Sequence, residues 1–404
     1  MERQVRNTIQ SLIGPTLVSA ALVIVVAGGL SSSHAQRRGD QEFAWPAPPD
    51  PPRIAYVGVV QSDADIGRRG SMLSRVKRAL VGEKEQHMFL SRPHDVWGSP
   101  DGRIFVTDRV GGGRLVVFDP KEKEARVIEP TGESRMAKPM GITGDALGFL
   151  YVADRSQRRI IKITDQGEFI TAYGGADSLL NPVDVATTES GDRVYVADSY
   201  LHQIVIFDGE GNLLRRAGRN RESIQEKRKR LDKASANKKA SEGTHGKAET
   251  SDIIANRGDG DGEFRYPAFV AASRDSVYVS DTMNFRVQVL DRDGNFVRQI
   301  GQIGRTPGSF ARPKGLGVDS HGHVYVADAA FNNIQIFNGS GALLLSFGSM
   351  GGGYGEFWQP LGIAVSDERL YVVDRFNDRI QVFDYLPVAG EADGTSGSTD
   401  GKGF

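Results

Sequence analysis

YVVDRFNDRIQVFD, the stretch Tyr371–Asp384, decides the fold of this chain. The run that opens it, Arg369–Asp374, is rich in β-branched and aromatic residues and ends on an aspartate, which predicts a short strand. A polar link, Arg375–Asp378, comes next, and Arg379–Phe383 has the composition of a second strand. The stretch therefore predicts two neighbouring strands joined by a tight turn.

The same pattern occurs five more times along the chain. The copies are Ile104–Asp119, Tyr151–Asp165, Tyr195–Asp208, Tyr278–Asp291 and Tyr325–Asn338. The aspartates that end the first strand of each copy, called marker aspartates below, are Asp108, Asp154, Asp198, Asp281, Asp328 and Asp374. They lie 46, 44, 83, 47 and 46 residues apart, so the long interval holds one repeat plus an insertion. A period of about 45 residues with four strand-like runs in each unit is typical of a β-propeller blade.

A short lead-in precedes each pair of strands and begins at a proline. The six prolines are Pro93, Pro139, Pro182, Pro267, Pro313 and Pro360. A Pro-x-Gly-Ile strand, then Val-Tyr-Val-Ala-Asp, then Asn-x-Arg-Ile-Gln-Val-Phe, resembles the NHL repeat, and the resemblance spans Leu90 to Tyr385. It implies an all-β fold, a six-bladed β-propeller of four-stranded antiparallel blades. It implies much less about activity, because one fold hosts many functions.

The last repeat lacks a fourth strand of its own, because the chain after Tyr385 turns to Gly, Ser and Asp. The strand-like run without a partner is Arg53–Val60, RIAYVGVV. A propeller hides its open sheet edge when one terminus completes the last blade. We therefore predict that Arg53–Val60 pairs with the third strand of blade six, Arg379–Phe383, and that the propeller spans residues 53–386.

The segments outside the propeller predict export from the cytoplasm. Residues 1–35 contain the apolar run Leu17–Leu30 and end on small residues that suit a signal peptidase. This segment is a cleaved signal peptide or an N-terminal transmembrane anchor, and either places the propeller in the periplasm or outside the cell. Residues 36–52 read as a proline-rich spacer and residues 387–404 as a disordered tail.

Composition excludes several kinds of function. The chain has 404 residues, no cysteine and a formal net charge of −1. The lack of cysteine excludes disulfides, thiolate zinc sites and a cysteine nucleophile, and with them the zinc module of NHL-repeat ubiquitin ligases. The balanced charge and the predicted export argue against nucleic acid as a partner. The insertion, residues 219–256, is basic and lacks aromatic residues, so it is a solvated loop or a docking arm for an anionic partner.

Titratable residues give little support for a metal site. The marker aspartates lie one per blade, where the carboxylate at a strand end accepts hydrogen bonds from turn N–H groups. The resemblance to peptidyl-hydroxyglycine amidating lyases implies zinc on three lead-in histidines, but only His94 matches that pattern. The resemblance to gluconolactonase-like propellers implies an axial calcium, which Asp95 and Asp184 could reach. We expect no cofactor and no catalytic residue, with a single axial Ca or Zn as the alternative.

One side of the propeller carries the candidate binding surface. In a four-stranded blade, the links from the second to the third strand and the links between blades emerge on one side, called here the near face. The other links emerge on the far face, where their sequences are those of ordinary turns. Near-face links carry aromatic and basic residues that a turn does not need. The predicted surface is Arg109, Arg155, Tyr200, His202, Phe285, Phe331, Tyr354, Trp358, Arg375 and Phe376. Several of these, Phe285 and Phe376 above all, could instead pack between blades.

The sequence leaves two functions open. The first is a non-catalytic, monomeric scaffold outside the cytoplasm whose near face binds a protein or glycan of the cell envelope. The second is a metal-assisted lyase or hydrolase with its site on the propeller axis, of the peptidyl-hydroxyglycine amidating lyase or gluconolactonase type. The metal content of the purified protein separates the two.

Overall fold

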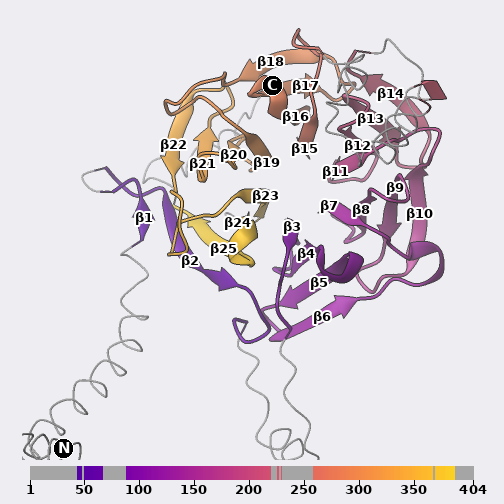
Figure 1. Cartoon of the computed structure of the whole chain (residues 1–404). Helices are drawn as coiled ribbons and strands as arrows, with labels where there is room; N and C mark the ends of the chain where they lie inside the picture. The colour runs from indigo at the N-terminus through magenta and orange to yellow at the C-terminus, as the bar shows by residue number, and fades with distance from the viewer. Residues whose placement is uncertain are drawn as a thin grey trace, which may run out of the picture.

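The computed structural model describes residues 43–47, 50–66, 88–219, 225, 226, 229, 258–366 and 369–386. Six antiparallel sheets stand around a central axis, and the first strand of each sheet lies next to that axis (Figure 1). The predicted six-bladed propeller is therefore confirmed. Segments 1–35 and 387–404, and most of the spacer 36–52 and the insertion 219–256, lie outside the described residues.

Each blade begins at a lead-in proline, and its second strand ends at a marker aspartate, as the repeat predicts. Blade one is β3 (Pro93–Gly98), β4 (Ile104–Asp108), β5 (Arg114–Asp119) and β6 (Glu124–Ile128). Blade two is β7 (Pro139–Gly144), β8 (Leu150–Asp154), β9 (Arg159–Ile163) and β10 (Phe169–Gly174). Blade three is β11 (Pro182–Thr187), β12 (Arg193–Asp198), β13 (Gln203–Asp208) and β14 (Leu213–Ala217).

The remaining blades repeat this order. Blade four is β15 (Pro267–Ala272), β16 (Ser276–Asp281), β17 (Arg286–Asp291) and β18 (Phe296–Ile300). Blade five is β19 (Pro313–Val318), β20 (Val324–Asp328), β21 (Asn333–Phe337) and β22 (Leu343–Phe347). Blade six takes β23 (Pro360–Ser366), β24 (Arg369–Asp374) and β25 (Arg379–Tyr385) from the end of the chain. The second strands β4, β8 and β20 are buried along their whole length, because neighbouring strands and neighbouring blades cover them.

The fourth strand of blade six comes from the other end of the chain. β2 (Ile54–Val60) pairs antiparallel with β25, with Ile54 opposite Tyr385 and Val60 opposite Ile380. The predicted closure of the ring by an N-terminal strand is confirmed. A further short strand, β1 (Ala44–Trp45), adds to the outer edge of β2, and the Trp45 ring lies 5.2 Å from that of Phe347 in blade five.

The marker aspartates join the lead-in of each blade to the turn after its second strand. In blade two, the Asp154 carboxylate accepts hydrogen bonds from the backbone N–H of Ala137 and Lys138 in the lead-in, at 2.5 and 3.1 Å. It also accepts them from Ser156 and Gln157 in the turn, at 2.9 and 3.1 Å. Because a buried carboxylate is costly unless its lone pairs are satisfied, these bonds fix the near face of every blade. The predicted structural role of these aspartates is confirmed.

Within the described residues, no helix is both long and apolar enough to cross a membrane.

Candidate functional site

The near face carries an uneven ring of positive charge around the axis. Three positions in each blade reach this part of the face: the residue before the lead-in proline, the residue after it, and the residue after the marker aspartate. Across the six blades these positions hold seven Lys or Arg residues and no Asp or Glu. The seven, called here the basic crescent, are Arg92, Arg109, Lys138, Arg155, Arg312, Lys314 and Arg375. They come from blades five, six, one and two, which are neighbours in the ring.

His94 shows how closely these cations approach the axis. Its side chain is buried, and burial lowers the pKa of the imidazole to about 3, helped by the charges of Arg109, Arg375, Lys314 and Arg155. Four cations from four blades therefore act on one axial residue, and His94 stays neutral.

The cations of the crescent also act on one another. Burial, and then the charges of Arg375, Arg155 and Arg92, lower the pKa of Arg109. Burial and the charges of Arg312 and Arg375 lower the pKa of Lys314 to about 8. The side chains of Arg109 and Lys314 make no hydrogen bond or ion pair in the described part of the chain. Arg109 and Lys314 thus lie among like charges without an ion-pair partner in the described part of the chain, whereas the charge of Arg92 acts on the carboxyl group of Asp378.

Two aromatic side chains stand beside the crescent. Trp358 and Phe376 are 47% and 46% exposed, and their rings meet edge to face with centroids 5.5 Å apart. The Arg375 guanidinium lies 4.9 Å from the centre of the Phe376 ring. Phe376 therefore does not pack between blades, and the two rings, called here the aromatic pair, offer apolar surface next to positive charge.

Not every residue of the predicted binding surface is available to a partner. His202 is fully buried, and its Nδ1 accepts a hydrogen bond from the Tyr266 backbone at 3.0 Å, so its place in the predicted surface is wrong. Tyr354 is exposed but packs on Tyr56 of β2, with ring centroids 4.8 Å apart, at the outer edge of blade six. Phe285 and Phe331 are half-buried.

Three other predicted residues stay on the near face near the axis. Arg155 lies 5.9 Å from the centre of the Tyr200 ring and also donates a hydrogen bond to Asn181. Arg109 and Arg375 belong to the basic crescent. Sequence reasoning missed Arg92, Lys138, Arg312 and Lys314, which complete it.

The axis itself holds two buried carboxyl groups. Asp95 Oδ2 accepts a hydrogen bond from Ile142 N, and Asp184 Oδ2 accepts one from Val270 N, both at 2.8 Å. Burial raises the pKa of Asp95 to about 7 and that of Asp184 well above its usual range, and the charge of Asp95 raises the pKa of Asp184 further. The protonated forms of both carboxyl groups are therefore favoured. Asp184 can enter this space because residue 141 is glycine, where a Cβ would come within 1.9 Å of its Oδ1.

This pair does not fit the axial calcium or zinc that the family resemblance implies. The two backbone N–H groups that point at the carboxyls are donors and would repel a cation. Neither aspartate, nor His94, belongs to a group of three metal-ligating side chains anywhere in the described residues. The carboxyl pair acts instead as a polar cross-link between the inner strands.

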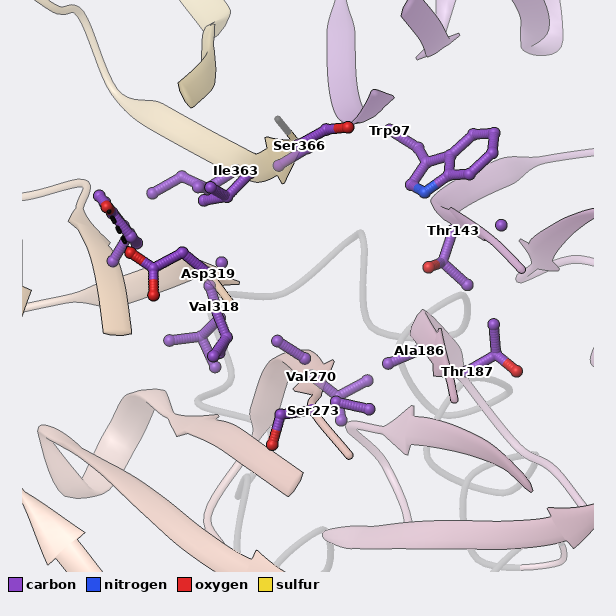
Figure 2. A pocket seen from close by; sticks show the side chains of 18 of the residues that line it. Trp97, Thr143, Ala186, Thr187, Val270, Ser273, Val318, Asp319, Ile363 and Ser366 are labelled. Carbon is purple, nitrogen blue, oxygen red and sulfur yellow. Dashed lines mark hydrogen bonds between the residues drawn. The ribbon is translucent and has the colours of Figure 1, made fainter. Parts of the chain in front are cut away.

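The far face opens into a cavity of about 1300 Å³ that the sequence did not predict. Its deep end reaches Asp95, Asp184 and Phe269, and its walls come from the ends of the inner strands in all six blades. Figure 2 shows side chains from around its circumference, among them Trp97, Thr143, Thr187, Ser273, Asp319 and Ser366.

Comparisons with known proteins agree with this architecture. A family model described as a 6-bladed beta-propeller matches residues 259–330 and 319–388, and an NHL repeat model matches residues 179–207. The chain is a six-bladed β-propeller. More particularly, one of its repeats, residues 179–207, matches the NHL repeat that the sequence pattern resembles. No curated protein matches it.

Solved structures with the same fold are distant in sequence. A gluconolactonase from Xanthomonas campestris is 14% identical over 82% of this chain and 98% of its own, with a TM-score of 0.50. A protein of unknown function from Bacteroides thetaiotaomicron is 13% identical over 73% of this chain and 70% of its own, also with a TM-score of 0.50. Virginiamycin B lyase from Staphylococcus aureus is 15% identical over 74% and 84%, with a TM-score of 0.46. At these identities the likeness concerns the fold alone.

Proposed function

We propose that this protein is a non-catalytic binding scaffold that works outside the cytoplasm. Its near face binds a partner that presents carboxylate, phosphate or sulfate groups, carried by a protein or glycan of the cell envelope. The observation that carries this proposal is the basic crescent, which brings seven cations to one side of the axis without a carboxylate among them. The extracytoplasmic location rests on the export segment predicted for residues 1–35.

An anionic partner would relieve an unfavourable arrangement of charge. Burial and like charges disfavour the charged forms of Arg109 and Lys314, as their lowered pKa values indicate. Bound anionic groups would favour those charged forms again. Five of the seven cations are arginines, at positions 92, 109, 155, 312 and 375, and a planar guanidinium can hold a carboxylate or phosphate by two parallel hydrogen bonds.

The aromatic pair adds apolar contact area to this charged surface. Interfaces obtain much of their affinity from a few aromatic and arginine side chains that lose water on binding. Trp358, Phe376 and Arg375 form such a group, with the guanidinium already placed against one ring. Charge would therefore draw the partner to the face, and the aromatic pair would hold it there.

The experiment measures binding of three polyanions to the folded chain: a polyuronate glycan, a poly-glutamate peptide and a single-stranded RNA. The double variant Arg109→Glu with Arg375→Glu should weaken binding of the preferred polyanion at least about tenfold, since it reverses two charges in the crescent. Binding should also weaken as salt is added.

A matched control separates the near face from overall charge. Lys121→Glu with Arg274→Glu makes the same change in net charge at two exposed far-face residues and should leave the affinity within about twofold. Equal losses in both double variants would contradict the assignment to the near face. Preference for RNA over both other probes would replace the protein or glycan partner with a nucleic acid.

A further inference from the structure

One turn at the mouth of the far-face cavity gathers two histidines and an aspartate. The turn joins β19 to β20 and contains Asp319, His321 and His323. Each of the three offers one ligand atom, and these atoms lie within 4.8 Å of one another, which is true of no other trio in the described residues. Asp319 and His321 line the cavity, and Figure 2 shows Asp319 at its wall.

The equivalent turn of blade two shows which of these residues the fold requires. There, Asp145 Oδ1 accepts hydrogen bonds from Leu147 N and Phe149 N, both at 3.0 Å, and its Oδ2 accepts one from the Tyr151 hydroxyl at 2.9 Å. The fold therefore needs the aspartate and the tyrosine, and it accepts Leu and Phe at the other two positions.

Blade five keeps that frame and replaces the two apolar residues by histidines. Asp319 Oδ1 accepts from His321 N at 2.9 Å and from His323 N at 2.8 Å, and its Oδ2 accepts from the Tyr325 hydroxyl at 3.0 Å. Both imidazoles project from a turn that is stable without them. The two rings stack with centroids 5.9 Å apart and pack beside Tyr385, so they supply packing contacts as well as ligand atoms.

The Asp319 carboxylate and one imidazole already lie close enough to bind the same ion. Asp319 Oδ2 lies 2.8 Å from His323 Nδ1. An ion bound to both atoms would take the place of the proton between them and would hold them slightly further apart.

We propose that Asp319, His321 and His323 bind one divalent transition-metal ion, Zn²⁺ or a neighbour of similar ligand preference. Two imidazoles and a carboxylate are a common ligand set for such ions. Metal–ligand bonds of about 2.1 Å bring ligand atoms to about 3.4 Å from each other, so a modest turn of the exposed His321 ring closes the site. A three-ligand site leaves at least one coordination position, which would face the cavity.

The site is independent of the proposed near-face function. It lies on the opposite side of the propeller and uses none of the residues of the basic crescent. Its chemistry is that of a resident metal at the entrance of a cavity, where the ion could bind a water molecule or an anionic group of a small ligand.

The test is zinc titration of the full, untagged chain by calorimetry, with metal content measured after dialysis. The double variant His321→Leu with His323→Phe copies the turn of blade two, so it should fold as the wild type does and keep its melting temperature. We expect one saturable zinc ion per wild-type chain and at least about thirtyfold weaker binding in the variant.

His94→Ala is the control, because it removes a histidine at the axis on the other face. It should bind zinc as the wild type does. Cobalt in place of zinc should give visible absorption bands of a nitrogen- and oxygen-ligated ion, and these bands should vanish in the double variant. Zinc binding that survives the double variant, or that is lost with His94→Ala, would overturn the proposal, as would a wild-type chain with no saturable binding.

Discussion

At the scale of single residues, one carboxylate in each blade organises the near face. Asp154 accepts four backbone hydrogen bonds, two from the lead-in before its blade and two from the turn after its strand. These bonds set the positions of Lys138 and Arg155, whose side chains leave from the same two segments. The residues that keep the fold together and the residues that face a partner are thus immediate neighbours in sequence.

Replacing a marker aspartate should be costly. Asp154→Ala removes a carboxylate that accepts four backbone hydrogen bonds, and each hydrogen bond to a charged group contributes about 1.5–3 kcal/mol, so we expect a loss of at least about 3 kcal/mol in the free energy of unfolding. Urea denaturation measures it. Asp293→Ala, in an exposed far-face turn, should change stability by less than about 0.5 kcal/mol. Similar effects of the two substitutions would count against the structural role of Asp154.

The axial carboxyl pair predicts how stability depends on pH. The folded-state pKa values of Asp95 and Asp184 lie above the unfolded value of about 3.9, so the folded chain holds more protons from there up to about pH 7 and beyond. Stability should therefore fall as pH rises through this window, by up to about 1.4 kcal/mol per pH unit for each extra proton. His94, with its lowered pKa, acts in the opposite sense below about pH 6.5.

Asp184→Asn isolates the contribution of the pair. The amide does not titrate, so one of the two groups with a raised pKa is removed, and the variant should lose less stability than the wild type between about pH 5 and about pH 8. Urea midpoints at the two pH values measure the difference, with Asp293→Asn as the control. A variant with the same pH dependence as the wild type would show that the Asp184 carboxyl group does not contribute to it.

At the scale of elements, β2 is the strand on which the ring depends. It supplies the fourth strand of blade six, and its Ile54 is completely buried in a cluster with Phe357 and Phe383. Without β2, the edge of β25 would be open to solvent and to other strands.

Removing β1 and β2 should open the ring. Deletion of residues 36–60 should lower the melting temperature by more than about 10 °C, because several kcal/mol of apolar burial are lost. Replacement of residues 220–256 by a short Gly/Ser link is the control of similar length, and it should leave the melting temperature nearly unchanged, since the basic composition of this insertion gives it little to bury. An unchanged melting curve after the first deletion would argue against closure by β2 in solution.

At the scale of the whole molecule, the propeller presents two faces of different chemistry. The near face has the basic crescent and the aromatic pair, and the far face has the cavity with the Asp319, His321 and His323 turn. The inner strands and the axial carboxyl pair lie between them. Because the two faces are separated by the packed centre, their ligands should bind without affecting each other.

This independence can be measured directly. Saturating zinc should change the affinity for the preferred polyanion by less than about twofold, and added salt should weaken polyanion binding much more than zinc binding. The same full-length protein serves both titrations. A strong mutual effect would mean that the two sites communicate through the axis.

The repeats made the fold predictable, whereas the two sites depended on long-range contacts. Pro-initiated lead-ins and marker aspartates recur in register, so blade number and ring closure followed from the sequence. The basic crescent did not, because its members occupy three different positions in the repeat and meet only around the axis. His202 resembled a surface turn residue, yet the Tyr266 backbone of the next blade buries it. The effect of the Asp95 charge on the pKa of Asp184 arises between blades one and three.

The pairing of β2 with β25 also fixes when the fold can be completed during synthesis. Among the described strands, β2 leaves the ribosome before blades one to five and β25 leaves it after them. The ring therefore cannot close before β25 has been synthesised. Until then, blades one to five form an open arc. Premature termination anywhere before Tyr385 would leave β2 without its full partner. A closed ring therefore requires that the whole propeller has been synthesised.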